Sequence, residues 1–73
     1  MNYQERIVIN PEKRFGKPCI KGTRITVYDV LRWFSIGMTM EEILQDYEEL
    51  SREDILACLS YASDKERRIT VLV

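Results

Sequence analysis

A helix-start pattern occurs three times in this chain. In each copy an apolar residue is followed by Ser or Thr, then by an acid three positions later and an apolar residue one position further. The hydroxyl accepts a hydrogen bond from a first-turn N–H, the acid complements the positive end of the helix, and the two apolar residues pack together. The copies are Ile25-Thr26-Asp29-Val30, Met38-Thr39-Glu42-Ile43 and Leu50-Ser51-Asp54-Ile55. The pattern predicts three short helices in series, the last two forming a helix-turn-helix.

Apolar spacing and stop signals give each helix an approximate range. We expect the first over residues 27–36, where Gly37 is placed to supply a left-handed C-terminal cap. The second is expected over residues 40–47 and the third over residues 52–66. The helices therefore occupy most of the second half of the chain.

β-favouring runs flank the helices on both sides. Residues 6–9 predict a strand, and residues 12–24 carry Gly and Pro among basic residues, as in a loop or hairpin. Residues 69–73 are apolar and rich in β-branched side chains, so they predict a short C-terminal strand. The expected fold is one mainly α domain over residues 1–73. It comprises a β arm with a Gly/Pro loop (1–25), a three-helix bundle (26–66) and a C-terminal tail (67–73).

Size and composition narrow the function. A chain of 73 residues has a small core, and unpaired strands at 7–9 and 69–73 would leave open edges, so we expect a homodimer. The absence of His removes the commonest general base and zinc ligand, so we expect no enzyme, metal or cofactor. Cys19 and Cys58 lack CxxC spacing, and no export signal or long apolar run is present. A reduced cytoplasmic protein without membrane contact is therefore expected, with a disulfide as the lesser alternative.

Charge divides the chain into two unlike parts. Residues 1–34 contain seven basic and three acidic residues, a net charge of +4, whereas residues 35–73 contain four basic and nine acidic residues, a net charge of −5. This division suggests a polyanion or acidic partner for the first part and a basic partner for the second, although solvated surface explains charged residues equally well.

One ordered motif carries a family resemblance. Gly16-Lys17-Pro18-Cys19-Ile20-Lys21-Gly22-Thr23-Arg24 stands before the first helix, and Leu50-Ser51-Arg52-Glu53-Asp54-Ile55 opens the third. Over residues 7–62 the chain resembles the small prokaryotic family known as domain of unknown function 433. The resemblance implies a homeodomain-like three-helix fold with an N-terminal β arm. It also implies a role as antitoxin of a type II toxin–antitoxin pair whose toxin resembles a PIN-domain ribonuclease.

Candidate functional residues follow from these patterns. A structural role in the loop and the helix caps is expected for Gly16, Pro18, Gly22, Thr23, Thr26, Thr39 and Ser51. Nucleic-acid contact is expected for Lys17, Lys21, Arg24 and Arg32, with plain solvation as the open alternative. Contact with the toxin is expected for the tail residues Ile69, Thr70, Val71, Leu72 and Val73.

The helix-turn-helix departs from DNA-reading versions of the motif. Its turn holds Glu48-Glu49 without Gly, and its second helix opens with Arg52-Glu53-Asp54, whose carboxylates would repel phosphates. If DNA is bound, the basic arm is the better candidate. The resemblance implies an antitoxin that binds a ribonuclease, with operator DNA as a second candidate partner, and the alternative is a stand-alone helix-turn-helix regulator.

Overall fold

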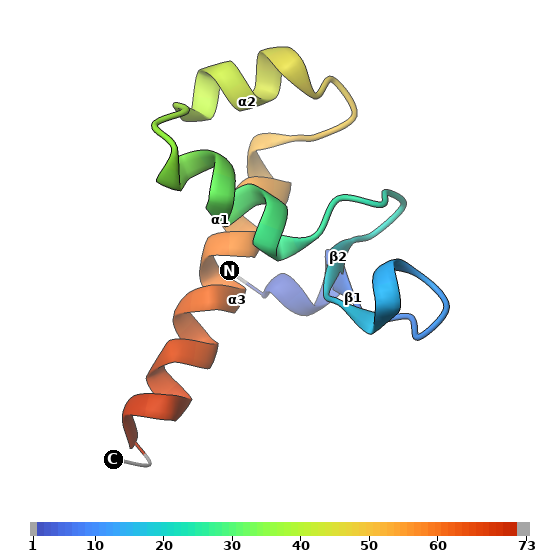
Figure 1. The fold of residues 1–73 in the computed structure, drawn as a ribbon, viewed down its shortest axis with the longest axis vertical. Helices are drawn as coiled ribbons and strands as arrows, with labels where there is room; N and C mark the ends of the chain where they lie inside the picture. The colour runs from blue at the N-terminus through green and yellow to red at the C-terminus, as the bar shows by residue number, and fades with distance from the viewer. Residues whose placement is uncertain (1, 72–73) are drawn as a thin grey trace.

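The chain folds into three helices and a two-stranded antiparallel hairpin (Figure 1). The computed structural model describes residues 2–71, and the side chains of residues 2–66. The N-terminal arm consists of the short 3-10 helix η1 (Tyr3–Glu5), β1 (Ile7–Val8), the 3-10 turn η2 (Arg14–Gly16) and β2 (Cys19–Ile20). The helices that follow are α1 (Val27–Ser35), α2 (Met40–Asp46) and α3 (Arg52–Val71).

All three predicted helix starts are confirmed, each with a reciprocal capping box. Asp29 N–H donates to Thr26 Oγ1 over 2.9 Å, while Thr26 N–H donates to Asp29 Oδ2 over 3.0 Å. At α2 the corresponding bonds join Thr39 and Glu42 at 3.2 and 2.9 Å. At α3 they join Ser51 and Asp54 at 3.2 and 3.0 Å. Each box thus provides hydrogen-bond acceptors for two backbone N–H groups that have no acceptor within the helix.

The end of α1 also follows the prediction. Gly37 has φ of +98°, and its N–H donates to the Phe34 carbonyl over 3.0 Å. Met38 N–H donates to the Trp33 carbonyl, also over 3.0 Å. This pair of bonds is a Schellman motif, which requires a left-handed residue and therefore favours Gly. The chain turns sharply here, and α2 lies across the end of the molecule (Figure 1).

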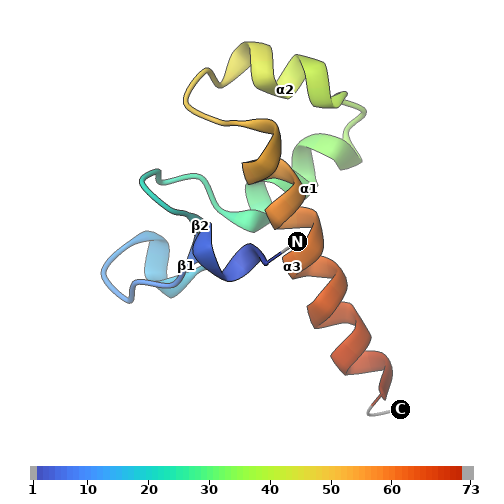
Figure 2. The ribbon, with the colours of Figure 1, turned by 180° about the vertical axis from the view of Figure 1, so that it is seen from behind.

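The two strands of the arm form a hairpin, through which the arm packs on the helical core. Ile7 lies opposite Ile20 and Val8 opposite Cys19, so the predicted strand is real but only two residues long. The arm also contacts α3: Tyr3 Oη donates to Asp64 Oδ2 over 2.7 Å, and the Tyr3 and Tyr61 rings meet edge-on at 5.4 Å. Figure 2 shows the ribbon of η1 beside α3. The buried core draws on the arm and on all three helices: Ile7, Ile20, Val27, Val30, Ile43, Leu50, Ile55, Ala57 and Cys58.

The predicted C-terminal strand is wrong over residues 69–71, because α3 continues to Val71. Leu72 and Val73 lie outside the described residues. The helix is longer than expected because no Gly, Pro or other stop signal follows Glu66, and extending an existing helix is far easier than starting a strand without a partner. A homodimer therefore no longer follows from two open strands, since β1 is paired with β2 and residues 69–71 are helical.

Candidate functional site

The loop between β2 and α1 is a tight turn built by the motif residues. Gly22 has φ of +81°, and Thr23 N–H donates to the Ile20 carbonyl over 3.0 Å. Thr23 Oγ1 donates to the same carbonyl over 2.9 Å and accepts from Ile25 N–H over 3.0 Å. Gly22 supplies a backbone conformation that other residues rarely adopt, and the Thr23 hydroxyl bonds backbone groups on both sides of the turn. Both residues therefore have a structural explanation.

The preceding part of the arm is fixed in a similar way. The Pro18 carbonyl accepts a bond from Val27 N–H over 2.9 Å, which attaches the arm to the first turn of α1. Gly16, at φ of +77°, ends a left-handed turn that also contains Arg14 and Phe15, at φ of +49° and +59°. Two consecutive residues other than Gly in this region are uncommon, and each costs conformational free energy.

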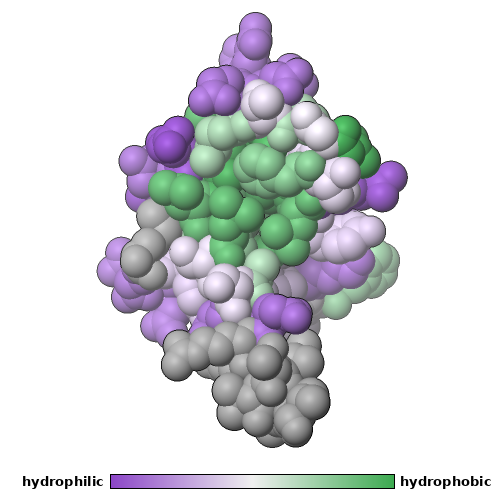
Figure 3. Space-filling model, turned by 90° about the vertical axis from the view of Figure 1, so that its left-hand side faces the viewer, coloured by the Kyte–Doolittle hydropathy of each residue, from purple (hydrophilic) through white to green (hydrophobic). Residues whose placement is uncertain are grey.

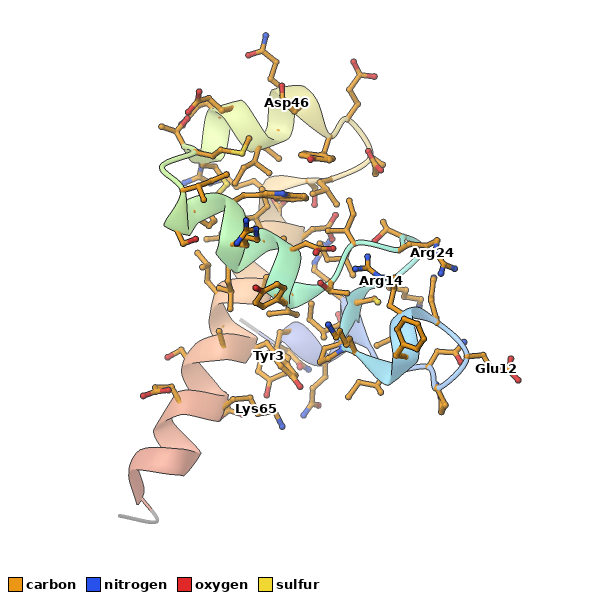
Figure 4. All side chains as sticks on the ribbon, viewed as in Figure 1. Tyr3, Glu12, Arg14, Arg24, Asp46 and Lys65 are labelled. Atoms are coloured by element: carbon orange, nitrogen blue, oxygen red, sulfur yellow. The ribbon has the colours of Figure 1, made fainter. Side chains whose placement is uncertain are left out.

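Arg14 holds this turn against α1. One of its guanidinium nitrogens, Nη1, donates to the Arg24 carbonyl over 2.7 Å and lies 3.2 Å from Asp29 Oδ2 (Figure 4). Burial opposes ionisation of Asp29, but hydrogen bonds from Thr26 and the charge of Arg14 outweigh it, so the pKa of Asp29 lies below its ordinary value. The same carboxylate thus closes the α1 capping box and anchors the basic loop.

The four predicted nucleic-acid residues do not form one cluster. Lys17 Nζ lies 5.6 Å from the centre of the Tyr28 ring, and Tyr28 lines a shallow hollow on α1 together with Arg32. Lys21 instead borders a polar hollow beside Arg6. All four side chains carry exposed charge, and within the part of the chain that the structure describes Lys21, Arg24 and Arg32 form no side-chain hydrogen bond or ion pair. These three cations are available to a ligand.

The first turn of α3 is occupied by contacts within the chain. Arg6 Nη1 donates to Asp54 Oδ1 over 3.0 Å, while the other oxygen of Asp54 accepts from Ser51 N–H. Asp54 therefore joins the arm to the helix that would enter a DNA groove in a helix-turn-helix protein. Glu53 beside it is exposed. This end of α3 therefore presents Glu53 beside the exposed Arg52, while Asp54 is paired with Arg6.

Carboxylates and apolar side chains are concentrated around α2. Every acid from the first turn of α2 to the start of α3, apart from Asp54, is exposed: Glu41, Glu42, Asp46, Glu48, Glu49 and Glu53. Figure 3 shows apolar side chains gathered on the side of the molecule at the left of Figure 1, with hydrophilic groups around them. Ile36, at the end of α1, is 64% exposed, and Met38 and Met40 are half-buried. The six exposed acids and these three apolar residues together are called the α2 surface.

Two features of the arm could not be predicted from the sequence: a left-handed turn and a long-range ion pair. The left-handed turn at Arg14-Phe15 carries no sequence signal beyond the following Gly, because Arg and Phe rarely adopt positive φ. The Arg6–Asp54 pair joins residues 48 positions apart, and charge patterning along the sequence does not predict pairs so far apart.

The tail residues predicted to contact the toxin lie partly on the last turn of α3, since residues 69–71 are helical, and nothing in their described backbone identifies a partner. Among the described residues no three metal-ligating side chains gather, and no helix combines the length and apolarity needed to cross a membrane.

Comparison with known proteins identifies the family. The model of the family described as "Protein of unknown function (DUF433)" matches residues 7–62. An uncharacterized protein, y4eO of Sinorhizobium fredii, is 32% identical over 59 residues, which are 81% of this chain and 27% of that protein. The crystal structure of a DUF433 member from Anabaena variabilis aligns with a TM-score of 0.82 at 30% identity, covering 92% of this chain and 66% of that one. Rv2018 of Mycobacterium tuberculosis aligns with a TM-score of 0.65 at 26% identity, covering 78% of this chain and 27% of that one.

These proteins are longer than the matched region. The chain spans about a quarter of y4eO and of Rv2018, and about two thirds of the Anabaena chain. The family match nevertheless takes in both capping boxes of the helix pair, the hairpin and the Gly/Pro loop. On the family model and the shared fold together, this chain belongs to the DUF433 family.

Proposed function

We propose that this chain is the antitoxin of a type II toxin–antitoxin pair and that it neutralises a ribonuclease toxin similar to PIN-domain proteins. In this proposal the chain is a cytoplasmic homodimer without catalytic activity, and its three helices have a homeodomain-like arrangement. The class of toxin comes from the family resemblance of the sequence, whereas the mode of binding comes from the α2 surface.

The observation that carries the proposal is the charge of the α2 surface. Six exposed acids lie between residues 41 and 53, against the single base Arg52. A ribonuclease binds its substrate through cations that face phosphates, so its RNA groove attracts a surface of this kind. An acidic helix seated in that groove would exclude RNA by charge and by bulk.

Apolar groups next to the acids supply the remaining contact. Ile36 is exposed, and Met38 and Met40 flank the turn from α1 into α2. Stable protein interfaces combine such a desolvated apolar centre with a charged rim, since the centre supplies affinity and the rim supplies orientation and association rate. Met side chains also adapt to the shape of a partner.

The tail has a smaller place in this mechanism than the sequence suggested. Addition of residues 69–73 as a strand to a toxin sheet does not fit the helical backbone of residues 69–71. Contact of these residues with the toxin stays a prediction. The main docking site is therefore assigned to α2.

The alternative, a stand-alone DNA-binding regulator, has less support. Its reading helix would be α3, whose first turn carries exposed Glu53 and an Asp54 already paired with Arg6. Acids at that position repel the phosphates of the duplex. Operator binding, where it accompanies the antitoxin role, is assigned to the basic arm.

Co-expression with the product of the adjacent reading frame tests the proposal. The chain should copurify with that protein and suppress its ribonuclease activity. The double variant Glu41→Lys/Asp46→Lys should weaken the complex by about tenfold or more, because it places cations against a basic groove while sparing the capping acid Glu42.

A control is Glu12→Lys, a charge reversal at an exposed acid that lies on the arm and away from α2. It should leave the complex and the inhibition intact. Failure to copurify would reject the antitoxin role. Full inhibition by the α2 double variant would reject the docking site.

A further inference from the structure

Phe15 is the most conspicuous side chain that the proposed toxin contact does not use. It is 96% exposed, although large apolar side chains normally lie inside. Its backbone has φ of +59°, in the left-handed region that is unfavourable for any residue with a branched or bulky side chain. Folding thus spends conformational free energy to place this ring in solvent.

The turn that presents the ring is held by several bonds. Gly16 N–H donates to the Lys13 carbonyl over 3.1 Å, and Lys17 N–H donates to the Arg14 carbonyl over 3.2 Å. Arg14 reaches inward to the Arg24 carbonyl and to Asp29, as Figure 4 shows for the labelled arginines. Neighbouring residues therefore point in opposite directions, with the guanidinium of Arg14 toward α1 and the ring of Phe15 toward solvent. Strain maintained by surrounding bonds is characteristic of binding sites.

The loop that carries the ring is rich in cations, although the exposed acid Glu12 precedes it. Residues 13–24 contain five cations and no acid: Lys13, Arg14, Lys17, Lys21 and Arg24. Lys17, two positions from Phe15, lies over the ring of Tyr28, which is itself 59% exposed. Phe15, Lys17 and Tyr28 thus belong to one end of the arm and the adjoining start of α1, and Arg24 lies beside Arg14. Two of the other cations face elsewhere, because Arg14 is paired with Asp29 and Lys21 borders the hollow beside Arg6.

Exposed aromatic rings next to cations are typical of surfaces that bind single-stranded nucleic acid. Cations bind the phosphates, and exposed rings stack on bases that are free of a duplex. A duplex would satisfy the cations but offer no base to Phe15. We propose that Phe15, Lys17, Arg24 and Tyr28 form a binding surface for single-stranded nucleic acid, on which Phe15 stacks against an unpaired base. This surface, the Phe15 loop, is independent of the α2 surface and of the toxin.

Fluorescence anisotropy with the full chain tests this proposal. The probes are a labelled ten-nucleotide DNA strand of mixed sequence, the RNA strand of the same sequence, and the corresponding DNA duplex, each measured over a series of salt concentrations. We expect a single strand to bind more tightly than the duplex, and the two strand types identify whether DNA or RNA is preferred. Phe15→Ala should weaken strand binding by roughly five- to hundredfold without changing the salt slope, since the ring carries no charge. Arg24→Gln should weaken binding and lower the slope by about one.

Further variants separate stacking from folding. Phe15→Trp should restore binding, and Phe15→Asn should abolish stacking while suiting the left-handed backbone, so its loss of binding cannot come from a distorted turn. Ile9→Ala removes an exposed apolar side chain of the arm outside residues 13–24 and should bind as the parent does. Tighter binding to the duplex, no binding at low salt, or unchanged binding by Phe15→Ala would each overturn the proposal. So would loss of toxin copurification in Phe15→Ala without any binding of oligonucleotide, which would assign the ring to a protein contact.

Discussion

The three capping boxes share one hydrogen-bond pattern but differ in burial, which permits a graded test of the fold. Thr26 is 1% exposed, Ser51 is half-buried and Thr39 is exposed. Loss of the hydroxyl at any of them removes one bond to a first-turn N–H. At an exposed cap, water replaces that bond, whereas at Thr26, which is almost fully buried, water reaches the freed N–H of Asp29 less easily.

The expected magnitudes follow from these environments. Thr39→Ala and Ser51→Ala should each lower the free energy of unfolding by ~1 kcal/mol. Thr26→Ala should cost ~2–3 kcal/mol, because loss of a buried methyl adds ~0.8 kcal/mol and the buried N–H adds its own desolvation cost. For a domain of this size that larger loss lowers the melting temperature by roughly 10–20 °C. Thr26→Val keeps the methyl volume, so it isolates the contribution of the hydroxyl.

Urea unfolding followed by far-ultraviolet circular dichroism measures this series. Ser63→Ala serves as control, because Ser63 is exposed on α3 and caps no helix; its effect should stay within about 0.5 kcal/mol. Equal losses at Thr26 and Thr39 would show that burial of the cap has no weight. Unchanged unfolding midpoints in all three Ala variants would refute the capping argument itself.

Three other outcomes are expected. Burial, and then the charge of Asp54, raise the pKa of the Cys58 thiol to about 12, so Cys58, like the buried Cys19, should resist a thiol-alkylating reagent at pH 8 until urea unfolds the chain, as followed by mass spectrometry. The pKa of Asp29 lies below its ordinary 3.8, so the ionised carboxylate stabilises the fold above pH 3.8, and this stabilisation is lost as the pH falls through the lower folded-state pKa. In melts at acid pH, Asp29→Asn should therefore reduce the dependence of the unfolding free energy on pH below about 4. Light scattering at micromolar concentration should give a dimer mass, because a chain of 73 residues has a small core and association would bury further apolar area, and a monomer mass would contradict this expectation.

Local signals predicted the helices well because their evidence lies within a few residues. A cap and its acid are three positions apart, and the Schellman motif of α1 needs only Gly37 in the right place. The basic loop was located for the same reason, since Gly, Pro and cations mark it directly. Local signals do not tell which loop side chains point inward: Arg14 binds α1, whereas the Arg24 side chain forms no hydrogen bond or ion pair among the described residues. That choice depends on Asp29, fifteen positions away, and on where the fold places it.

The end of α3 shows the opposite case, in which a local preference gave the wrong result. Ile69, Thr70 and Val71 favour strands because their branched side chains pack well on a pleated surface beside a neighbour. A strand, however, gains its hydrogen bonds only from a partner, and β1 is already paired with β2. A helix that has begun at the Ser51 cap gains one internal bond for each residue it adds, and the modest helix propensity of branched residues costs less than that bond returns. Strand propensity at a chain segment therefore predicts a strand only where the rest of the fold offers an open edge.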